Sequence, residues 1–514
     1  MLDLGSTFVQ SVERNPNALA LVADDQRLTY EQWFLVIKAV AGGLEKLGLK
    51  HGDHLVAIMP NRWEMATLHW ACQYLGVIIT PLNWRSKAEE IDYCVLDSAA
   101  SVIIYDESCL AELSEAQTLK TITGVAVDAG IMPEHLRFQT LLEADPIQGG
   151  PRASAEDFSL MLYTSGTTGK PKGVPRRHRH ERAAALAHVA QNIYSIGEIT
   201  LGIMPLYHTM GVRSLLSMAL IDGGFVCLPK FDSAAALALI EKEKITNLYL
   251  VPTLYHDILS HPNFDTTDIS SVKKLGFAGA PMAAALLKKL DQAFTPELFV
   301  NHYGSSEIYT FSINQNARLK AGSSGRASIN SRLRIVKLGS KDPNNLAPAL
   351  EEGEIIAHTQ SDEAFEGYWN RPDANESSFA DGWYFTGDTG YFDKDGELFV
   401  TGRVDDMIIS GGENISPVDI ESVLSLHPHV DEVAVAGLTD ERWGQKAVAF
   451  IKLKEPIEKS ELDAHCQASD LANFKRPKDY VFVKELPKSP VGKILRRKLV
   501  SGEYEPNPNT LDEQ

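Results

Sequence analysis

Cysteine and basic residues are the two kinds of side chain that this sequence has little of. Its five cysteines are spread over 514 residues, with no CxxC pair and no histidine nearby at the spacing of a metal site. This pattern offers no zinc site and is typical of a reducing compartment. The 49 lysines and arginines are outnumbered by 68 aspartates and glutamates, so the formal net charge is -19. That charge argues against general binding to the phosphate backbone of nucleic acids.

Long apolar runs are also missing. No uninterrupted apolar stretch approaches the roughly 20 residues that are needed to span a bilayer. Residues 1–20 lack the basic and apolar regions of a secretory signal. We therefore expect a soluble, cytoplasmic protein with no membrane or nucleic-acid partner. Hydrophobic residues make up 44% and charged residues 23% of the chain, which is the balance of an ordinary globular protein.

Helical and strand patterns alternate through the first part of the chain. Residues 28–47 have apolar side chains at helical spacing, and Thr29 followed by Gln32 predicts a capping box at the start of this helix. Strands are predicted at 54–59, 77–80, 101–105, 201–204, 225–228, 247–251 and 274–278, and helices at 63–75 and 87–96. Strands separated by helices indicate parallel sheets joined by crossover helices, and hence an α/β fold.

The pattern changes near Gly325, after which short strands are predicted at 333–337, 353–358 and 397–400. The last hundred or so residues form a second pattern, with helices predicted at 417–426 and 459–469 and strands at 432–438 and 447–452. We therefore expect a large N-terminal domain, residues 1–404, of βαβ subdomains with a small β-rich subdomain. A small α+β C-terminal domain, residues 405–514, follows the charged turn around Asp405. The polar end at 501–514 is expected to be frayed.

The strongest local motif is YTSGTTGKPKG at residues 163–173, which follows an apolar run at 158–162. Its glycines allow tight turns that bring amide N–H groups close to an anion, and its hydroxyl and ammonium groups add donors. The motif predicts a phosphate-holding loop, with a flexible surface loop as the alternative. It is not a Walker A loop, because the spacing differs and Pro171 stands where serine or threonine is required.

This motif resembles the signature loop of the AMP-forming adenylating enzymes, which include acyl-CoA synthetases, luciferases and the adenylation domains of peptide synthetases. The resemblance extends over nearly the whole chain, because further family motifs follow in order. The segments of this sequence that resemble these motifs are YGSSE at 303–307, WYFTGD at 383–388, GRVDD at 402–406 and KSPVGK at 488–493. Segments 403–415, 442–445 and 474–478 are most similar to the 4-chlorobenzoate:CoA ligases of this family.

The resemblance implies a reaction in two steps. A carboxylate is a poor acylating agent, but its attack on the α-phosphorus of ATP gives an acyl-adenylate, from which a thiol can displace AMP. The first step brings anions together and needs cations, Mg²⁺ and fixed donors. The implied catalytic residues are Lys493, His208 and Glu307, with Thr164 and Glu307 at the Mg²⁺. Taken singly, His208 could be a structural histidine and Glu307 a solvated loop carboxylate.

The implied ATP or AMP site is larger than any one motif. It comprises Thr164, Ser165, Gly166, Thr167, Thr168, Gly169, Lys172, Ala278, Gly279, Ala280, Tyr303, Gly304, Ser305, Ser306, Asp388 and Arg403. An ionised carboxylate at Asp388 suits the ribose, since it can accept hydrogen bonds from both neighbouring hydroxyls. Taken alone, an aspartate in Thr-Gly-Asp is a common turn residue.

For the second step, the resemblance implies that the C-terminal domain is mobile and rotates about Asp405 to admit CoA. The implied CoA-binding residues are Gly411, Gly412, Trp443, Phe474, Lys475, Arg476 and Lys478. The basic run at 176–180 is a second candidate for the CoA phosphates, with a surface helix start as an equal alternative. ATP, Mg²⁺ and CoA are the expected cofactors.

Alignment with the chlorobenzoate ligases places the acyl pocket at Ala187, His208, Thr209, Tyr249, Ala278, His302, Gly304 and Tyr309. Buried histidine and tyrosine need hydrogen-bond partners, which favours a ring-substituted aryl acid such as a benzoate or hydroxybenzoate. No arginine or lysine stands at these positions, which disfavours a diacid. A medium-chain fatty acid, a carrier-protein thiol as acceptor, and a catalytically silent binding protein are the alternatives. A homodimer is left open.

Overall fold

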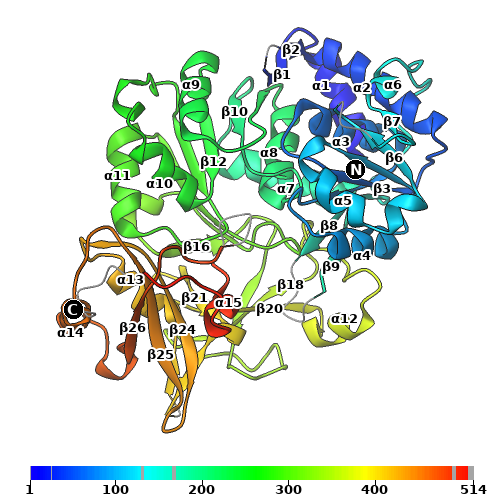
Figure 1. Cartoon of the computed structure of the whole chain (residues 1–514). Helices are drawn as coiled ribbons and strands as arrows, with labels where there is room; N and C mark the ends of the chain where they lie inside the picture. Colours follow the sequence, from blue (N-terminus) through cyan, green and yellow to red (C-terminus); the bar gives the residue numbers. More distant parts are fainter. Residues whose placement is uncertain are drawn as a thin grey trace.

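A computed structural model of the chain describes residues 2–24, 26–128, 132–164, 170–411, 413–488 and 494–507. Predicted site residues 165–169, Gly412 and Lys493 therefore lie outside the described residues. Figure 1 shows the arrangement, in which the C-terminal part, coloured orange to red, lies beside the green and yellow middle part. Mixed α/β layers with parallel sheets confirm the predicted fold class.

The N-terminal part contains a seven-stranded sheet that ends in a hairpin. Its order is β7 (Leu136–Arg137), β6 (Thr123–Ala126), β5 (Val102–Tyr105), β3 (His54–Ile58), β4 (Ile78–Leu82), β8 (Phe158–Thr164) and β9 (Lys172–Arg177). Neighbouring strands are parallel except β8 and β9, which are antiparallel. The hairpin places both ends of the predicted phosphate loop, Thr164 and Lys172, in register with each other.

Helices surround this sheet because parallel neighbouring strands must be joined by crossover connections, and these usually contain a helix. They are α1 (Leu4–Arg14), α2 (Tyr30–Lys46), α3 (Trp63–Leu75), α4 (Ala88–Ser98), α5 (Leu110–Glu115), α6 (Gln139–Leu142) and α7 (His178–Gln191), with 3₁₀ turns η1 (Glu107–Cys109) and η2 (Thr118–Lys120). The predicted capping box is confirmed: the Thr29 hydroxyl accepts from the Gln32 amide, and the Gln32 side chain accepts from the Thr29 amide.

A fourteen-stranded sheet forms the middle of the molecule. Its first half is β2 (Gln26–Thr29), β1 (Leu19–Ala23), β11 (Gly224–Cys227), β10 (Ile199–Gly202), β12 (Asn247–Leu250), β13 (Lys274–Phe277) and β14 (Leu298–Tyr303). From β1 to β14 these strands run parallel. The helices that accompany them are α8 (Thr209–Leu220), α9 (Ser233–Glu243), α10 (Pro252–Ser260) and α11 (Ala284–Phe294), with η3 (Phe264–Thr266).

The second half of this sheet consists of short antiparallel strands, and it contains the β-rich segment that is predicted after Gly325. It continues through β15 (Ser312–Asn314), β16 (Ser323–Ala327), β21 (Leu398–Arg403), β20 (Trp383–Phe392), β18 (Gly353–His358) and β17 (Leu333–Val336), with β19 (Phe379–Ala380), η4 (Ala317–Leu319) and α12 (Pro372–Ser378) beside them. β14 of the first half pairs with β15 of the second half, so the β-rich segment is joined to the last of the parallel strands.

A five-stranded sheet organises the C-terminal part. Its strands are β22 (Ile408–Ser410), β23 (Glu413–Ile415), β24 (Val430–Asp440), β25 (Gly444–Leu453) and β26 (Asp479–Phe482), and its helices are η5 (Val404–Asp406), α13 (Pro417–Leu424), α14 (Lys459–Gln467), η6 (Asn473–Lys475) and α15 (Arg496–Val500). This sheet has its own hydrophobic core, in which Ile408, Ile420 and Ile451 are buried. The domain boundary at Asp405 and the mobility of this part stay predictions.

The predicted fraying of 501–514 is wrong for residues 501–507. Asn507 donates its amide to the Phe482 carbonyl at 2.9 Å, and the Tyr504 ring packs on Phe450. Residues 508–514 lie outside the described part. All five cysteines are buried, and none of them forms a disulfide. Among the described residues, no helix combines the length and the apolar character needed to cross a membrane.

Candidate active site

One cavity of about 2780 Å³ opens at the carboxyl ends of the parallel strands of the large sheet, where α/β proteins bind ligands. It collects most of the residues that the sequence singles out. Those lining it are Thr164, Lys172, His208, Thr209, Tyr249, Ala278, Gly279, Ala280, His302, Tyr303, Gly304, Ser305, Ser306, Glu307, Tyr309, Asp388, Arg403 and Asp405. Ala187 is buried in α7 and does not line it, nor do Gly411, Trp443, Phe474, Lys475, Arg476 and Lys478.

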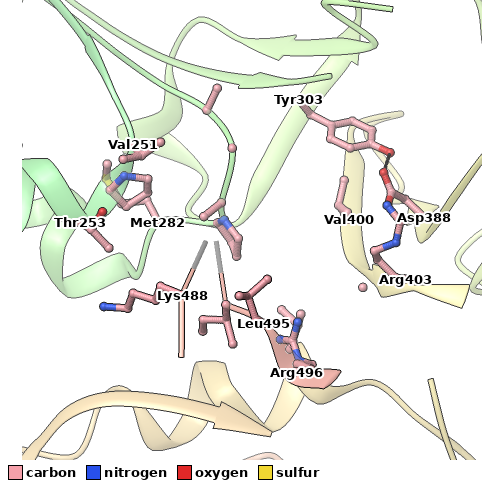
Figure 2. A pocket seen from close by; sticks show the side chains of 18 of the residues that line it. Val251, Thr253, Met282, Tyr303, Asp388, Val400, Arg403, Lys488, Leu495 and Arg496 are labelled. Atoms are coloured by element: carbon pink, nitrogen blue, oxygen red, sulfur yellow. Dashed lines mark hydrogen bonds and ion pairs between the residues drawn. The ribbon is translucent and has the colours of Figure 1, made fainter. Parts of the chain in front are cut away.

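Tyr303, Asp388 and Arg403 form a linked group on one wall of this cavity (Figure 2). The Tyr303 hydroxyl donates to Asp388 Oδ2 at 2.6 Å, and Arg403 Nη1 lies 3.1 Å from Asp388 Oδ1. The backbone explains why position 387 of the WYFTGD motif is a glycine. Its φ is +72°, and a Cβ there would lie 2.9 Å from Arg403 Nη2. The group therefore presents a fixed carboxylate, neutralised from one side, that can accept from vicinal hydroxyls.

Replacing this carboxylate tests the assignment. We expect Asp388→Asn to raise the KM for ATP about 10- to 100-fold, because a hydrogen bond to a charged group contributes about 1.5–3 kcal/mol. The KM for the acid is expected to change less. Steady-state pyrophosphate release measures both constants. Asp145→Asn is the control, since Asp145 is an exposed carboxylate that pairs with Lys46 and does not line the cavity, and an equal effect there would contradict the assignment.

Glu307 and Thr164 supply oxygen atoms that can bind a metal ion beside the predicted phosphate loop. Glu307 is not a solvated carboxylate: it is 7% exposed, and its Oε1 accepts from the Tyr368 hydroxyl at 2.8 Å. Lys172 Nζ lies 4.3 Å from the centre of the Tyr368 ring, and burial lowers the pKa of Lys172. The described residues hold no cluster of three metal-binding side chains. A hydroxyl and one carboxylate fit Mg²⁺, which keeps waters and takes its other ligands from substrate phosphates.

The basic run at 176–180 contains the start of α7, as one of its two predictions has it, and Arg177 and Arg179 pair with Glu366 and Glu156 at the surface. The other three residues are buried, so a CoA phosphate site stays a prediction for Arg177 and Arg179 alone. Arg176, His178 and His180 are at most 1% exposed. Arg176 Nε donates to Glu181 at 2.8 Å, and its Nη1 donates to the carbonyls of Glu307 at 2.9 Å and Glu363 at 2.6 Å. Arg176 thus ties β9 to the loop that carries Glu307.

His208 begins α8 and faces the cavity. Its Nδ1 accepts from the Met210 amide at 3.3 Å, which caps the helix. Gly211 in the next turn is required by close packing, because a Cβ there would lie 2.2 Å from the Pro205 carbonyl oxygen. The helix start is therefore pressed against the end of β10, and the histidine is held at the mouth of the predicted acyl pocket.

The acyl pocket contains a cation that the sequence alignment missed. Arg213 lies on α8, is 2% exposed, and lines the cavity beside Tyr249 and Tyr309. The eight aligned positions hold no arginine or lysine, but Arg213 lines the same cavity outside that set, so the argument against a diacid loses its basis. One signal was present, since Arg213 is the only charged residue in the α8 sequence TMGVRSLLSMAL, where the helical pattern predicts a buried side.

The C-terminal part borders the cavity on a further side, below the Tyr303–Asp388–Arg403 group in Figure 2. Lys488, Leu495 and Arg496 face into it. Lys488 pairs with Glu432, and Arg496 donates two hydrogen bonds to Glu421 at 2.7 and 2.8 Å. The residues on both sides of Lys493 that the structure describes, Lys488 and Ile494, are therefore at the cavity wall.

The predicted CoA residues lie elsewhere on the C-terminal part. A Cβ on Gly411 would lie 2.7 Å from the Trp443 ring, and Gly411 donates its amide to the Trp443 carbonyl at 2.8 Å. Lys475 pairs with Asp419 at 2.6 Å, and the Phe474 ring is 45% exposed. The structure thus separates the predicted CoA residues from the cavity that holds the predicted ATP residues.

Comparison with known proteins agrees with this geometry. The AMP-binding enzyme family matches residues 8–369, and its C-terminal domain family matches residues 419–493. A 4-chlorobenzoate–CoA ligase of Arthrobacter sp. is 34% identical, with 97% of this chain and 96% of that protein covered. A long-chain-fatty-acid–CoA ligase of Mycobacterium tuberculosis is 31% identical, with 96% and 97% covered.

Among solved structures, an anthranilate CoA ligase in complex with anthranoyl-AMP matches with a TM-score of 0.91 and 28% identity, covering 97% of each chain. The family match and the relatives extend over both the N-terminal and the C-terminal part. The chain therefore belongs to the AMP-binding enzyme family, the superfamily of adenylate-forming acyl-CoA ligases.

Proposed function

We propose that this protein is an ATP-dependent carboxylic acid:CoA ligase that forms AMP and acts on a ring-substituted aryl acid, such as a benzoate or hydroxybenzoate. One observation carries the proposal: a single cavity is lined by the Tyr303–Asp388–Arg403 group and by the aromatic residues Tyr249, His302 and Tyr309. Nucleotide and acid can therefore meet at Gly304, which follows β14 between the two groups.

In the first step, a carboxylate oxygen attacks the α-phosphorus of ATP and pyrophosphate leaves. Asp388 holds the ribose, and the buried Glu307 carboxylate with the Thr164 hydroxyl would hold Mg²⁺ on the phosphates. The ion supplies charge neutralisation when it is bound. The ammonium group of Lys493 would provide a further positive charge, since the nearest described residues on either side of it, Lys488 and Ile494, line the same cavity.

In the second step, the CoA thiol attacks the acyl carbon and AMP leaves. The separation of Trp443, Phe474, Lys475 and Arg476 from the cavity supports a rotation of residues 405–514 about Asp405, because these side chains cannot reach the adenylate as they stand. Ser416 of this part donates to the Thr401 carbonyl on the other side of Asp405, so this hydrogen bond is a contact that the rotation would change.

Pyrophosphate release across a series of acids, with and without CoA, tests the function. Release together with an aryl-CoA product supports the proposal. Release without a thioester indicates another acceptor, such as a carrier-protein thiol, and absence of release with every acid indicates a catalytically silent protein. Efficient use of medium-chain fatty acids in preference to benzoates would contradict the aryl assignment.

The two half-reactions are expected to respond to different substitutions. Lys493→Ala should lower adenylate formation about 100-fold or more, as loss of one fixed donor to a developing charge does, while thioester formation from supplied acyl-adenylate largely persists. Gly412→Leu should do the reverse by blocking the thiol. Lys498→Ala is the matched control, since Lys498 is 42% exposed and does not line the cavity. Equal loss of both half-reactions in both variants would refute the rotation.

A further inference from the structure

A buried guanidinium stands at the inner end of the predicted acyl pocket. Arg213 Nη1 donates to the Thr310 hydroxyl at 2.6 Å and to the Tyr309 carbonyl at 3.3 Å, and Nη2 donates to the Tyr249 hydroxyl. Among the described residues, Arg213 Nε has no hydrogen-bond partner, and no carboxylate forms an ion pair with this side chain. The cation is thus fixed by neutral groups and lines the cavity.

The nearest acidic side chains lie behind Arg213 and not on the cavity side. Glu181 and Glu363 are fully buried and feel the charge of Arg213, but neither lines the cavity. Glu181 is already held by Arg176 at 2.8 Å. A buried cation without a bonded carboxylate is costly unless a ligand supplies an acceptor. Arg213 therefore favours a substrate group that can accept a hydrogen bond.

His302 supplies the opposite kind of group, a bare acceptor. Asn192 Nδ2 donates to the His188 carbonyl at 2.8 Å, which turns its Oδ1 toward His302 Nε2 at 3.2 Å. An oxygen acceptor requires the proton to be on Nε2. Burial lowers the pKa of His302 well below its ordinary value, so the ring is neutral. Its Nδ1 is then a buried lone pair without a partner among the described residues.

Tyr249 lies between these two groups. Its ring centre is 5.0 Å from that of His302, and its hydroxyl accepts from Arg213. No described residue accepts the Tyr249 proton, so that proton can be donated to a ligand. Gly276 in the neighbouring strand makes room for the ring, because a Cβ there would lie 3.0 Å from Tyr249 Cδ2. The pocket therefore carries two donors that contact each other, on Arg213 and Tyr249, and one acceptor on the adjoining ring of His302.

We propose that Arg213, Tyr249 and His302 form the specificity site of this ligase and select an acid that carries a hydroxyl group at its far end. This inference rests on the proposed function and names its substrate class. A hydroxyl oxygen has two lone pairs, so it can accept from both Tyr249 and Arg213 while the hydroxyl proton is donated to His302 Nδ1. The hydroxyl group satisfies all three unpartnered positions, because it is donor and acceptor at once.

Other substituents leave part of this site unsatisfied. An alkyl chain pairs with none of the three residues, and each unpaired buried polar group costs about 1–3 kcal/mol. A second carboxylate accepts from Arg213 but has no proton for His302. A methoxy group has the same defect and is larger. An ammonium group is repelled by the guanidinium.

Substrate preference in the unmodified protein tests this site without any substitution. The probes are benzoate, the three monohydroxybenzoates, their methoxy counterparts and the benzenedicarboxylates, with kcat/KM measured by pyrophosphate release. One hydroxybenzoate isomer is expected to exceed benzoate by about 100-fold or more, because sites built to bond a hydroxyl strongly reject analogues that lack it. Its methoxy counterpart and the dicarboxylates are expected to fall below it.

Variants assign the preference to the named residues. Tyr249→Phe and Arg213→Met should each lower the ratio of kcat/KM for the preferred hydroxybenzoate over benzoate by about 10-fold or more. Tyr255→Phe is the matched control: its hydroxyl donates to the Leu248 and Gly276 carbonyls in the same strands, but it does not line the cavity. Its ratio should stay at that of the unmodified protein. Thermal melting shows whether Arg213→Met folds. If this variant does not fold, the kcat/KM ratio of Tyr249→Phe alone tests the hydroxyl site.

The outcomes separate this inference from the proposed function. If benzoate and every hydroxybenzoate give aryl-CoA with equal efficiency, the ligase assignment stands and the hydroxyl site is refuted. If a dicarboxylate is preferred, Arg213 binds a carboxylate and the hydroxyl site is likewise refuted. If no aryl acid releases pyrophosphate while fatty acids do, the proposed function itself fails. A hydroxyl preference that Tyr249→Phe removes and Tyr255→Phe keeps supports the inference.

Discussion

Replacing Arg176 by methionine is expected to lower the free energy of unfolding by about 3–5 kcal/mol, the usual cost of removing one partner of a buried ion pair. Both Arg176 and Glu181 are 0% exposed, and Glu181 would be left buried with only the Tyr309 hydroxyl, at 3.0 Å. Burial already raises the pKa of Glu181, so the carboxylate would take up a proton or draw in water.

The neighbouring arginine provides the control. Arg177 pairs with Glu366 at 2.6 Å, but these side chains are 24% and 43% exposed, so Arg177→Met should cost about 1 kcal/mol or less. Urea unfolding of both variants measures the difference. The double variant Arg176→Met with Glu181→Gln should recover part of the loss, because the uncompensated charge is gone. Equal losses for Arg176→Met and Arg177→Met would contradict the buried pair as the cause.

The same substitution is expected to affect the nucleotide site. Arg176 Nη1 holds the carbonyls of Glu307 and Glu363, so its loss frees the loop that aims the Glu307 carboxylate. We expect the KM for ATP to rise in Arg176→Met and to stay unchanged in Arg177→Met. Arg176 acts here through Glu307 and is a positioning residue.

Local patterns made much of the fold predictable. The helix at Tyr30–Lys46 is predictable from its apolar spacing and from the Thr29–Gln32 pair, because both signals extend over only one or two helical turns. The buried parallel strands His54–Ile58 and Val102–Tyr105 are short apolar runs that any sheet of crossover units would use. Strand ends were less predictable: β24 runs over Val430–Asp440, beyond the predicted 432–438, because its hairpin pairing with β25 continues through polar residues as far as Asp440 opposite Gly444.

Contacts distant in sequence explain what sequence reasoning missed. Arg176 was assigned to a surface because its neighbours are basic, whereas its partners Glu307 and Glu363 are 131 and 187 residues away. Arg213 meets Tyr249 and Thr310 across 36 and 97 residues. A charged residue in an apolar helix signals that some compensation exists. The sequence does not say which segment provides it, since that depends on how the sheet brings the strand ends together.

Acidification is expected to destabilise the protein below pH 6.5, well before its carboxylates are titrated. Burial lowers the pKa of His69 to about 3 and that of His54 and His178 to about 4. These rings are neutral in the folded protein, and His178 Nδ1 must accept from the Leu4 amide at 3.1 Å. Unfolded histidine binds a proton near pH 6.5, so below that pH the unfolded state holds more protons and stability falls.

The size of this effect follows from the same linkage. Each such histidine lowers the free energy of unfolding by about 2 kcal/mol between pH 6.5 and pH 5, and the loss continues until the pKa of the folded state is reached. Buried acids act in the opposite sense, because burial raises the pKa of Glu181 and Glu363 and the folded state then takes up their protons first. Urea unfolding between pH 5 and pH 7 gives the net slope.

A single substitution separates the histidines from these acids. His69→Gln removes one proton-binding group, so the decline of unfolding free energy with falling pH should become shallower by one proton. His69 is 2% exposed and its ring packs edge-on against Trp70, so the variant is less stable at neutral pH, but the slope is independent of that offset. Gln73→Ala, at a buried position of the same helix, is the control, because it removes packing but no proton-binding group and should leave the slope unchanged. If His69→Gln and the unmodified protein lose stability in parallel, His69 takes up its proton without unfolding, and the neutral, buried histidines are not the cause of acid sensitivity.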